Sequence, residues 1–168
     1  MKRLPHLNDR GETKMVDVSA KAVSFRRAVA EGRVRLSPAI VRAIRGNKAA
    51  KGNVLEVARI GAIQAAKKTF ELIPLCHQIP LTDISLAFDL KGIVLRIRAA
   101  VRAEAKTGVE MEALTAVSAA ALIVYDMCKG IDKGMEIGPI ELLEKEGGKS
   151  GSYKKPRRRK GTRIEDGG

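Results

Sequence analysis

Residues 82–104, TDISLAFDLKGIVLRIRAAVRAE, contain the pattern that decides the fold. Two stretches within it, Thr82–Leu90 and Ile93–Glu104, alternate apolar and polar side chains, as strands with one buried face do. Lys91-Gly92 between them has the composition of a two-residue hairpin turn. The sequence therefore predicts two neighbouring antiparallel strands. The polar positions of the second strand are mostly basic, so we expect one face of the sheet to meet water or anions.

A helix is predicted on either side of this hairpin. Asn53 with Glu56 three residues later has the pattern of a capping box, and the helix that follows ends before the next proline. Thr107 with Glu110 has the same pattern and begins a helix of about 22 residues, about 33 Å long. Gly130 is placed to end that second helix.

Two further strands complete the order of elements. They are residues 23–36, with a bend expected at Gly32, and Glu136–Leu143. A short helix from Ser37-Pro38 to Gly46 is inserted after the first. The order strand, helix, strand, strand, helix, strand predicts an α+β, ferredoxin-like βαββαβ fold, with an antiparallel sheet and the helices packed on one face.

The charge distribution divides the chain into three parts. We expect a loose N-terminus over residues 1–14, one domain over 15–152 and a disordered basic tail over 153–168. Residues 154–168 carry seven basic and two acidic groups, a net charge of +5, so the preceding 153 residues keep +8 of the total of +13. The body itself is basic, which favours anionic partners such as phosphates or nucleic acid.

The composition is less consistent with a secreted, membrane-spanning, zinc-binding or disulfide-linked protein. The N-terminus lacks the apolar run of a signal peptide, and the longest apolar stretch, Ala119–Tyr125, is too short to span a membrane. Cys76 and Cys128 are too few and too far apart for a zinc motif or a disulfide framework. We therefore expect a cytoplasmic protein with reduced thiols and no metal site of its own.

Few residues stand out as chemical candidates. His77 follows Cys76 in a loop after the first predicted helix, although a lone histidine is more often structural. Glu112, Asp126 and Lys129 fall on neighbouring stripes of the second helix. They are either an ordinary solvated face or, because the helix between Glu112 and Asp126 carries almost no charge, a surface buried against another subunit.

Lys51 lies just before the Asn53 cap and beside Gly52, where a lysine and free backbone amides suit a phosphate. An ordinary surface lysine is the simpler interpretation.

Seven segments together resemble the cyclic pyranopterin monophosphate synthase family, over about residues 4 to 152. They occur in the order expected for that family, which is more specific than any single motif. One departure is Gln78, where the family commonly has proline after the histidine of LCH. The segments are MVDVSAK at 15–21, KGNVLEVARIGAIQAAK at 51–67, LIPLCH at 72–77, KTGVEMEALTA at 106–116, IVYDMCK at 123–129, IGPI at 137–140 and GGKSG at 147–151.

The resemblance implies a lyase of molybdenum cofactor biosynthesis. Its substrate would be 3′,8-cyclo-7,8-dihydroguanosine 5′-triphosphate, made by a radical GTP cyclase. Its products would be cyclic pyranopterin monophosphate and diphosphate. The family implies no organic cofactor, and Mg²⁺ could accompany the triphosphate, although no acidic cluster marks a site for it. It also implies a homo-oligomer, a hexamer arranged as a trimer of dimers, with sites between subunits.

The resemblance also assigns roles to individual positions. Asp126 matches the residue regarded as catalytic, and Lys51 and Lys129 match lysines implicated in acid–base work and phosphate contact. Substrate-binding positions are implied at Leu75, Cys76, His77, Met111 and Glu112. Weaker candidates for phosphate binding are Lys21, Arg26, Lys67 and, in the loop at 147–151, Lys149.

The alternative is a basic ferredoxin-like nucleic-acid-binding module. Such modules stack bases on aromatic side chains of the central strands. Here the two hairpin strands offer only Phe88, which disfavours that interpretation. The basic tail could still bind nucleic acid nonspecifically.

Overall fold

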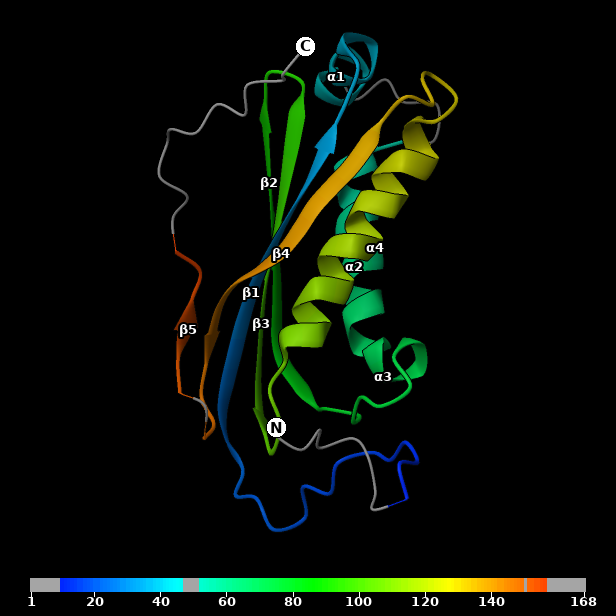
Figure 1. The fold of residues 1–168 in the computed structure, drawn as a ribbon. Coiled ribbons are helices and arrows are strands. Elements are labelled where there is room, and N and C mark those ends of the chain that lie inside the picture. Colours follow the sequence, from blue (N-terminus) through cyan, green and yellow to red (C-terminus); the bar gives the residue numbers. More distant parts are fainter. Residues whose placement is uncertain (1–9, 47–51, 150, 157–168) are drawn as a thin grey trace, which may run out of the picture.

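The computed structural model describes residues 10–46, 52–149 and 151–156. One antiparallel sheet has the strand order β2-β3-β1-β4-β5, and helices α2 and α4 lie on one face of it (Figure 1). This confirms the α+β, ferredoxin-like arrangement. The strands are β1 (Ser24–Arg35), β2 (Leu81–Lys91), β3 (Val94–Ala105), β4 (Glu136–Glu146) and β5 (Tyr153–Lys154), and the helices are α1 (Pro38–Arg45), α2 (Val54–Lys67), α3 (Thr69–Leu72) and α4 (Glu110–Cys128).

The β2–β3 hairpin forms as predicted, with its turn one residue later. Lys91 pairs with Val94, so Gly92 and Ile93 make the turn. Gly92 has a φ of 57°, a left-handed conformation that glycine adopts without the steric penalty of a side chain. The turn therefore forms with Gly92 as the first of its two central residues, because glycine adopts the left-handed conformation there.

The core lies between the sheet and the two long helices. Ala58, Ala62 and Ala66 of α2 are buried, and such small side chains allow α2 to approach α4 closely. At Gly61 an added Cβ would lie 2.2 Å from Cδ1 of Ile123 on α4. Glycine at position 61 therefore sets the spacing between the helices.

The two predicted helix starts have different outcomes. Asn53 caps α2, because its Oδ1 accepts a hydrogen bond from the Glu56 amide at 3.2 Å. The prediction of a Thr107–Glu110 capping box is wrong. Thr107 instead donates its hydroxyl to the Gly108 carbonyl at 3.1 Å, and α4 begins at Glu110 without a side-chain cap.

The first long helix is also shorter than predicted. It ends at Lys67, and α3 follows after one residue. At this break the Thr69 hydroxyl donates to the Ala66 carbonyl at 3.0 Å. The hydroxyl therefore adds a donor to a carbonyl in the last turn of α2, which the Lys68 amide also reaches.

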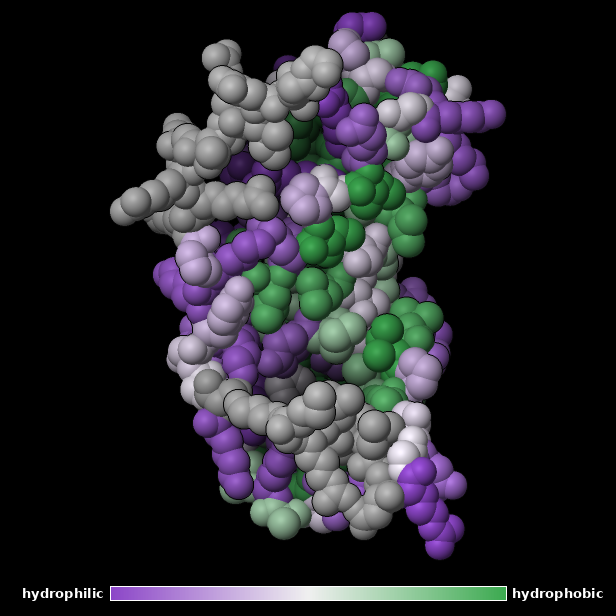
Figure 2. All heavy atoms as spheres, viewed as in Figure 1, coloured by the Kyte–Doolittle hydropathy of each residue, from purple (hydrophilic) through white to green (hydrophobic). Residues whose placement is uncertain are grey.

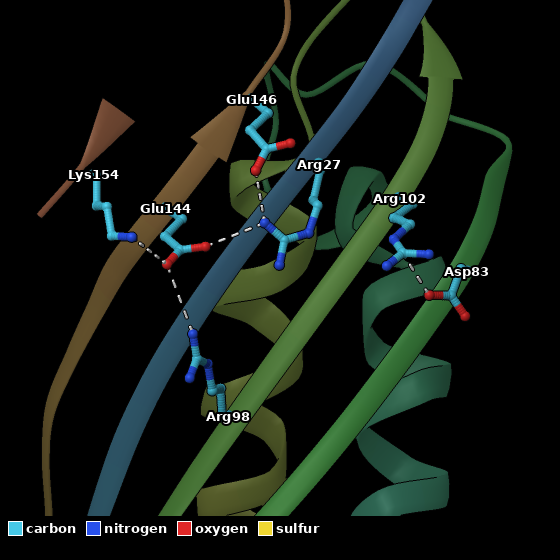
Figure 3. Close-up of polar contacts among 7 residues, drawn as sticks. All are labelled: Arg27, Asp83, Arg98, Arg102, Glu144, Glu146 and Lys154. Carbon is cyan, nitrogen blue, oxygen red and sulfur yellow. Dashed lines mark hydrogen bonds and ion pairs between the residues drawn. The ribbon is translucent and has the colours of Figure 1, made fainter. Parts of the chain in front are cut away.

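The face of the sheet opposite the helices stays polar and is crossed by ion pairs (Figure 3). Arg27 of β1 contacts Glu146 at 2.9 Å and Glu144 at 3.2 Å. Arg98 of β3 reaches Glu144 at 3.9 Å, and Lys154 of β5 reaches it at 3.7 Å. The basic residues of β3 thus face carboxylates across the strands, and this face is a wet ion-pair surface rather than an open anion site.

The tail boundary at residue 153 needs correction. Tyr153 and Lys154 form β5 on the edge of β4, and the Lys155 amide donates to the Leu143 carbonyl at 2.8 Å. Edge carbonyls and amides of β4 were open to such pairing, which the tail's basic composition concealed. The rest of the expected tail, residues 157–168, lies outside the described residues, as do residues 1–9 of the N-terminus.

Within the part of the chain that the structure describes, one helix, α4, is long and apolar enough to cross a membrane by length and composition alone. Half of its apolar window is buried inside the protein, where it packs on α2 and the sheet. Such burial is typical of a core helix.

Candidate active site

A cavity of about 360 Å³ opens at the end of the molecule where α4 begins. There the N-terminal segment, the chain after α3 and the start of α4 come together (Figure 1). We call this cavity the histidine pocket. It is lined by Val16, Val18, Lys21, Leu75, Cys76, His77, Ile79, Thr107, Gly108, Glu110, Met111 and Glu112.

The histidine pocket brings together most of the predicted binding residues. Leu75, Cys76 and His77 enter it from the loop after α3, and Met111 and Glu112 enter it from the first turn of α4. Burial raises the pKa of the Cys76 thiol, and the nearby Glu112 carboxylate raises it further. The Cys76 side chain therefore stays a neutral thiol at neutral pH.

Glu112 is the most unusual side chain in the pocket. It is only 4% exposed, and its Oε2 has no hydrogen-bond partner within the described residues. Burial, followed by the nearby Glu110 carboxylate, raises the pKa of Glu112 to about 7. A carboxyl group that titrates near neutral pH can both donate and accept a proton there, which general acid–base catalysis requires.

A second, larger cavity of about 960 Å³ adjoins the first and shares Lys21, Thr107, Gly108 and Glu110 with it. We call it the basic pocket. Among the described residues, five cations line it, against three acidic side chains, so its surface suits an anion. The cations are Lys21, Arg26, Lys106, Lys145 and Lys149, and the acids are Asp17, Glu110 and Glu146.

Arg26 is the fixed point of the basic pocket. Only 8% exposed, it donates from Nε to the Ala105 carbonyl at 3.1 Å and from Nη2 to the Lys106 carbonyl at 3.3 Å. Gly148 packs against its guanidinium, since a Cβ added there would lie 1.9 Å from Nη1. The guanidinium is thus held in place before any ligand binds.

Asp126 and Lys129 lie at the other end of α4. Lys129 Nζ contacts Asp126 Oδ1 at 2.7 Å, and both side chains are about half exposed. Its hydrogen bond to Asp126 raises the pKa of Lys129, so the lysine stays cationic at neutral pH. Within one chain this pair does not reach the histidine pocket, because Asp126 is 14 residues beyond Glu112, about 21 Å along the helix axis.

An apolar groove of about 600 Å³ lies beside this second end and includes Asp126. We call it the helix groove; its other lining residues are Val57, Ile60, Gly61, Leu122, Ile123 and Met127. Ile60 and Leu122 are 65% and 62% exposed. On the face shown in Figure 2, hydrophobic side chains also gather over β4 and the adjoining α4.

The charge-poor middle of α4 has a different explanation from the predicted one. Ala113, Val117, Ala120 and Val124 are buried within the chain's own core, against the sheet and α2. Leu122, which is exposed, remains available for a contact with another subunit. The exposed apolar residues of the helix groove, rather than the lack of charge on α4, are therefore the feature that needs a partner.

The other predicted residues fall in three groups. Lys21 and Arg26 line the basic pocket, as does Lys149. Lys67 is exposed at the end of α2 and lines none of the three cavities. Lys51 lies outside the described residues. Within the described part of the chain, no group of three or more His, Cys, Asp or Glu side chains is placed to hold a metal ion.

Sequence reasoning missed two lysines of the basic pocket, Lys106 and Lys145. Lys145 contacts Glu110, which lines both pockets, at 3.7 Å. Lys106 is the first residue of the family-like segment 106–116 and stands two residues before Gly108, and Lys145 stands two residues before Gly147. Their closeness to those glycines was the signal that could have found them.

Comparison with known proteins gives consistent matches. Residues 15–148 match the MoaC family. Proteins named cyclic pyranopterin monophosphate synthase from Thermomicrobium roseum, Parvibaculum lavamentivorans and Chloroflexus aurantiacus are 51%, 50% and 53% identical. The alignments cover 92%, 91% and 92% of this chain and 95%, 97% and 96% of those proteins. A solved putative aminohydrolase from methicillin-resistant Staphylococcus aureus aligns with a TM-score of 0.34 at 16% identity over 73% of this chain and 31% of that one, too remote to carry an argument.

Proposed function

The chain belongs to the MoaC family, and we propose that the histidine pocket and the basic pocket together hold its substrate. It is a lyase of molybdenum cofactor biosynthesis. It converts 3′,8-cyclo-7,8-dihydroguanosine 5′-triphosphate to cyclic pyranopterin monophosphate and diphosphate. The nucleic-acid-binding alternative is not favoured.

The single observation that carries the assignment of the site is Glu112. A buried carboxyl group with an unpaired oxygen and a pKa of about 7 faces a cavity that also contains His77. Rearranging a purine to a pterin requires protons to leave some atoms and arrive at others, and such a group can exchange them at neutral pH. We therefore assign the heterocycle to the histidine pocket and proton transfer to Glu112.

The triphosphate belongs in the basic pocket. It carries about four negative charges, and this pocket adjoins the first and places Lys21, Arg26, Lys145 and Lys149 around one space. Fixed cations stabilise the charge that develops as diphosphate leaves. We propose that any Mg²⁺ enters bound to the triphosphate, and no organic cofactor is needed for these steps.

Asp126 and Lys129 are brought to the substrate by a second copy of the chain. Two copies whose α4 helices lie antiparallel, with the helix groove of each packed against the Glu112 end of the other's α4, would place the Asp126 end of one helix near the Glu112 end of the other. The exposed Ile60 and Leu122 side chains supply apolar area for that contact. We propose that such dimers assemble into a hexamer, that Lys51 joins Lys129 in acid–base work, and that the radical GTP cyclase supplies the substrate in the cytoplasm.

The test is turnover of the purified chain with the cyclised triphosphate, measured as diphosphate and cyclic pyranopterin monophosphate released. Glu112→Gln should lower kcat by on the order of 10²–10⁴, as loss of a general acid–base group does. Glu56→Gln, an exposed glutamate at the start of α2, is the matched control and should keep normal turnover. Normal turnover of Glu112→Gln would show that the assignment of the site is wrong.

A further inference from the structure

One wall of the histidine pocket has no regular secondary structure. Residues 14–18 and 22–23 are neither helix nor strand, and residues 19–21 form a turn and a bend. Val16, Val18 and Lys21 from this segment line the pocket. The position of Lys21, which is shared with the basic pocket, therefore depends on what holds the segment in place.

Within the segment, local hydrogen bonds shape a turn. The Lys21 amide donates to the Val18 carbonyl at 3.0 Å, and the Ser19 amide donates to Asp17 Oδ1 at 2.8 Å. These two bonds restrict the chain locally, and hydrogen bonds from the Ser19 side chain and from its amide lower the pKa of Asp17. They do not attach the segment to the rest of the molecule.

The attachment comes from Lys106. Its Nζ donates to the Ser19 carbonyl at 2.8 Å, across 87 positions in the chain. Lys106 follows β3 directly, and its own carbonyl accepts a hydrogen bond from Arg26 at 3.3 Å. One end of Lys106 is thus fixed to the sheet while its ammonium group holds the segment. Asp17 on the same turn also lies within electrostatic range of Lys106 and His77.

We propose that Lys106 is a positioning residue that holds residues 15–21 against the pocket and thereby places Lys21 at the junction of the two pockets. It acts through the segment and not by touching the substrate. The ammonium group of Lys106 is engaged with Ser19, whereas that of Lys145 in the same pocket contacts the Glu110 carboxylate. The inference rests on the proposed function of that site.

A double-mutant cycle tests whether Lys106 acts through the turn. Lys106→Met keeps the aliphatic stem and removes the donor, and Asp17→Ala removes the acceptor that shapes the turn. Each should raise KM on the order of tenfold, the size of one charge-assisted hydrogen bond, with kcat little changed. Both changes together should raise KM no further than Lys106→Met alone, and Lys106→Arg should restore most of the loss.

If the double variant showed the product of the two single rises in KM, Lys106 would act independently of the turn and would contact the substrate. A normal KM for Asp17→Ala together with a raised KM for Lys106→Met would mean the same. Either result would overturn the proposal. A normal KM for Lys106→Met would overturn it too. Lys91→Met, which breaks an exposed ion pair with Asp89 near the hairpin turn, is the control.

A second measurement needs no turnover. Trypsin should cut after Lys14 and Lys21 faster in Lys106→Met than in the wild type or in Lys91→Met, with the sites identified by mass. Equal cleavage rates would overturn the proposal that Lys106 holds residues 15–21 in place. If the wild type released no diphosphate from the cyclised triphosphate, the proposed function would fail while the cleavage rates still decided the role of Lys106.

Discussion

Glu112 and Asp126 lie on the same helix, α4, one buried with an unpaired oxygen and the other exposed in an ion pair with Lys129. Fourteen residues separate them, about 21 Å along the axis. The family resemblance implies a role for each, yet no single reacting centre within one chain could touch both. The proposed site therefore draws on two half-sites at opposite ends of one helix.

The raised pKa of Glu112 predicts a pH-dependent stability. Its value rises from 4.5 to about 7 on folding. The folded state therefore keeps a proton that the unfolded chain loses between these values. The resulting stabilisation is complete below pH 4.5, declines as pH rises and is lost above about 7, a difference of roughly 3 kcal/mol.

Urea unfolding of the wild type and of Glu112→Gln from pH 4.5 to 8, at one protein concentration, measures this difference. The wild type should lose stability relative to the variant as pH rises. Parallel curves would show that Glu112 ionises in the folded state as easily as in the unfolded chain.

Gly148→Ala should disturb the basic pocket. A Cβ there would lie 1.9 Å from Arg26 Nη1 and would also impose strain at a φ of 80°. Gly151→Ala is the matched control, because its φ of 64° imposes similar strain while its Cβ meets nothing within 4 Å. Steady-state kinetics should give a KM about tenfold higher for Gly148→Ala than for the control, the effect of about 1.4 kcal/mol. Equal KM values would remove Arg26 from triphosphate binding.

Lys129→Ala should lower kcat by about 10²–10⁴, as loss of an acid–base group does. The Asp126 carboxylate raises the pKa of Lys129, so the residue acts as a cation or proton donor at neutral pH. Lys91→Ala removes another exposed lysine from an ion pair with a nearby carboxylate and should leave kcat unchanged. If both variants turned over normally, Lys129 would have no part in the reaction.

The fold was predictable because the alternation of residues 82–104 and the order of elements follow rules that depend only on local sequence. The turn was displaced by one residue because Gly92 takes its first central position, and the capping box did not form because the Thr107 hydroxyl donates to the Gly108 carbonyl instead. The β5 pairing was missed because it depends on a contact with β4 that local patterns do not encode. Within the site, the resemblance pointed to His77 and Glu112. Burial of Glu112 and the hold of Lys106 on Ser19 depend on chain segments that meet only after folding.

Deletions of the C-terminal region should differ in their effect on stability, depending on whether they remove β5. Removing residues 157–168 should leave kcat/KM unchanged, because they lie beyond the family match, which ends at residue 148. Removing residues 153–168 should also lower the unfolding temperature, since it takes away β5 and the ion pair of Lys154 with Glu144. Thermal unfolding and turnover of both truncated chains check this, and a tenfold loss of kcat/KM in the shorter deletion would contradict it.

Mixing two inactive variants tests the two-chain site most directly. His77→Ala disables one half-site, and Asp126→Ala disables the other. After subunit exchange, confirmed by mass, each mixed two-fold dimer holds one intact site, so random pairing should restore about a quarter of wild-type turnover. A mixture of His77→Ala with Glu112→Gln should restore none, because both changes affect the same half-site. No activity in the first mixture despite confirmed exchange would place His77 and Asp126 in one chain's site and contradict the account.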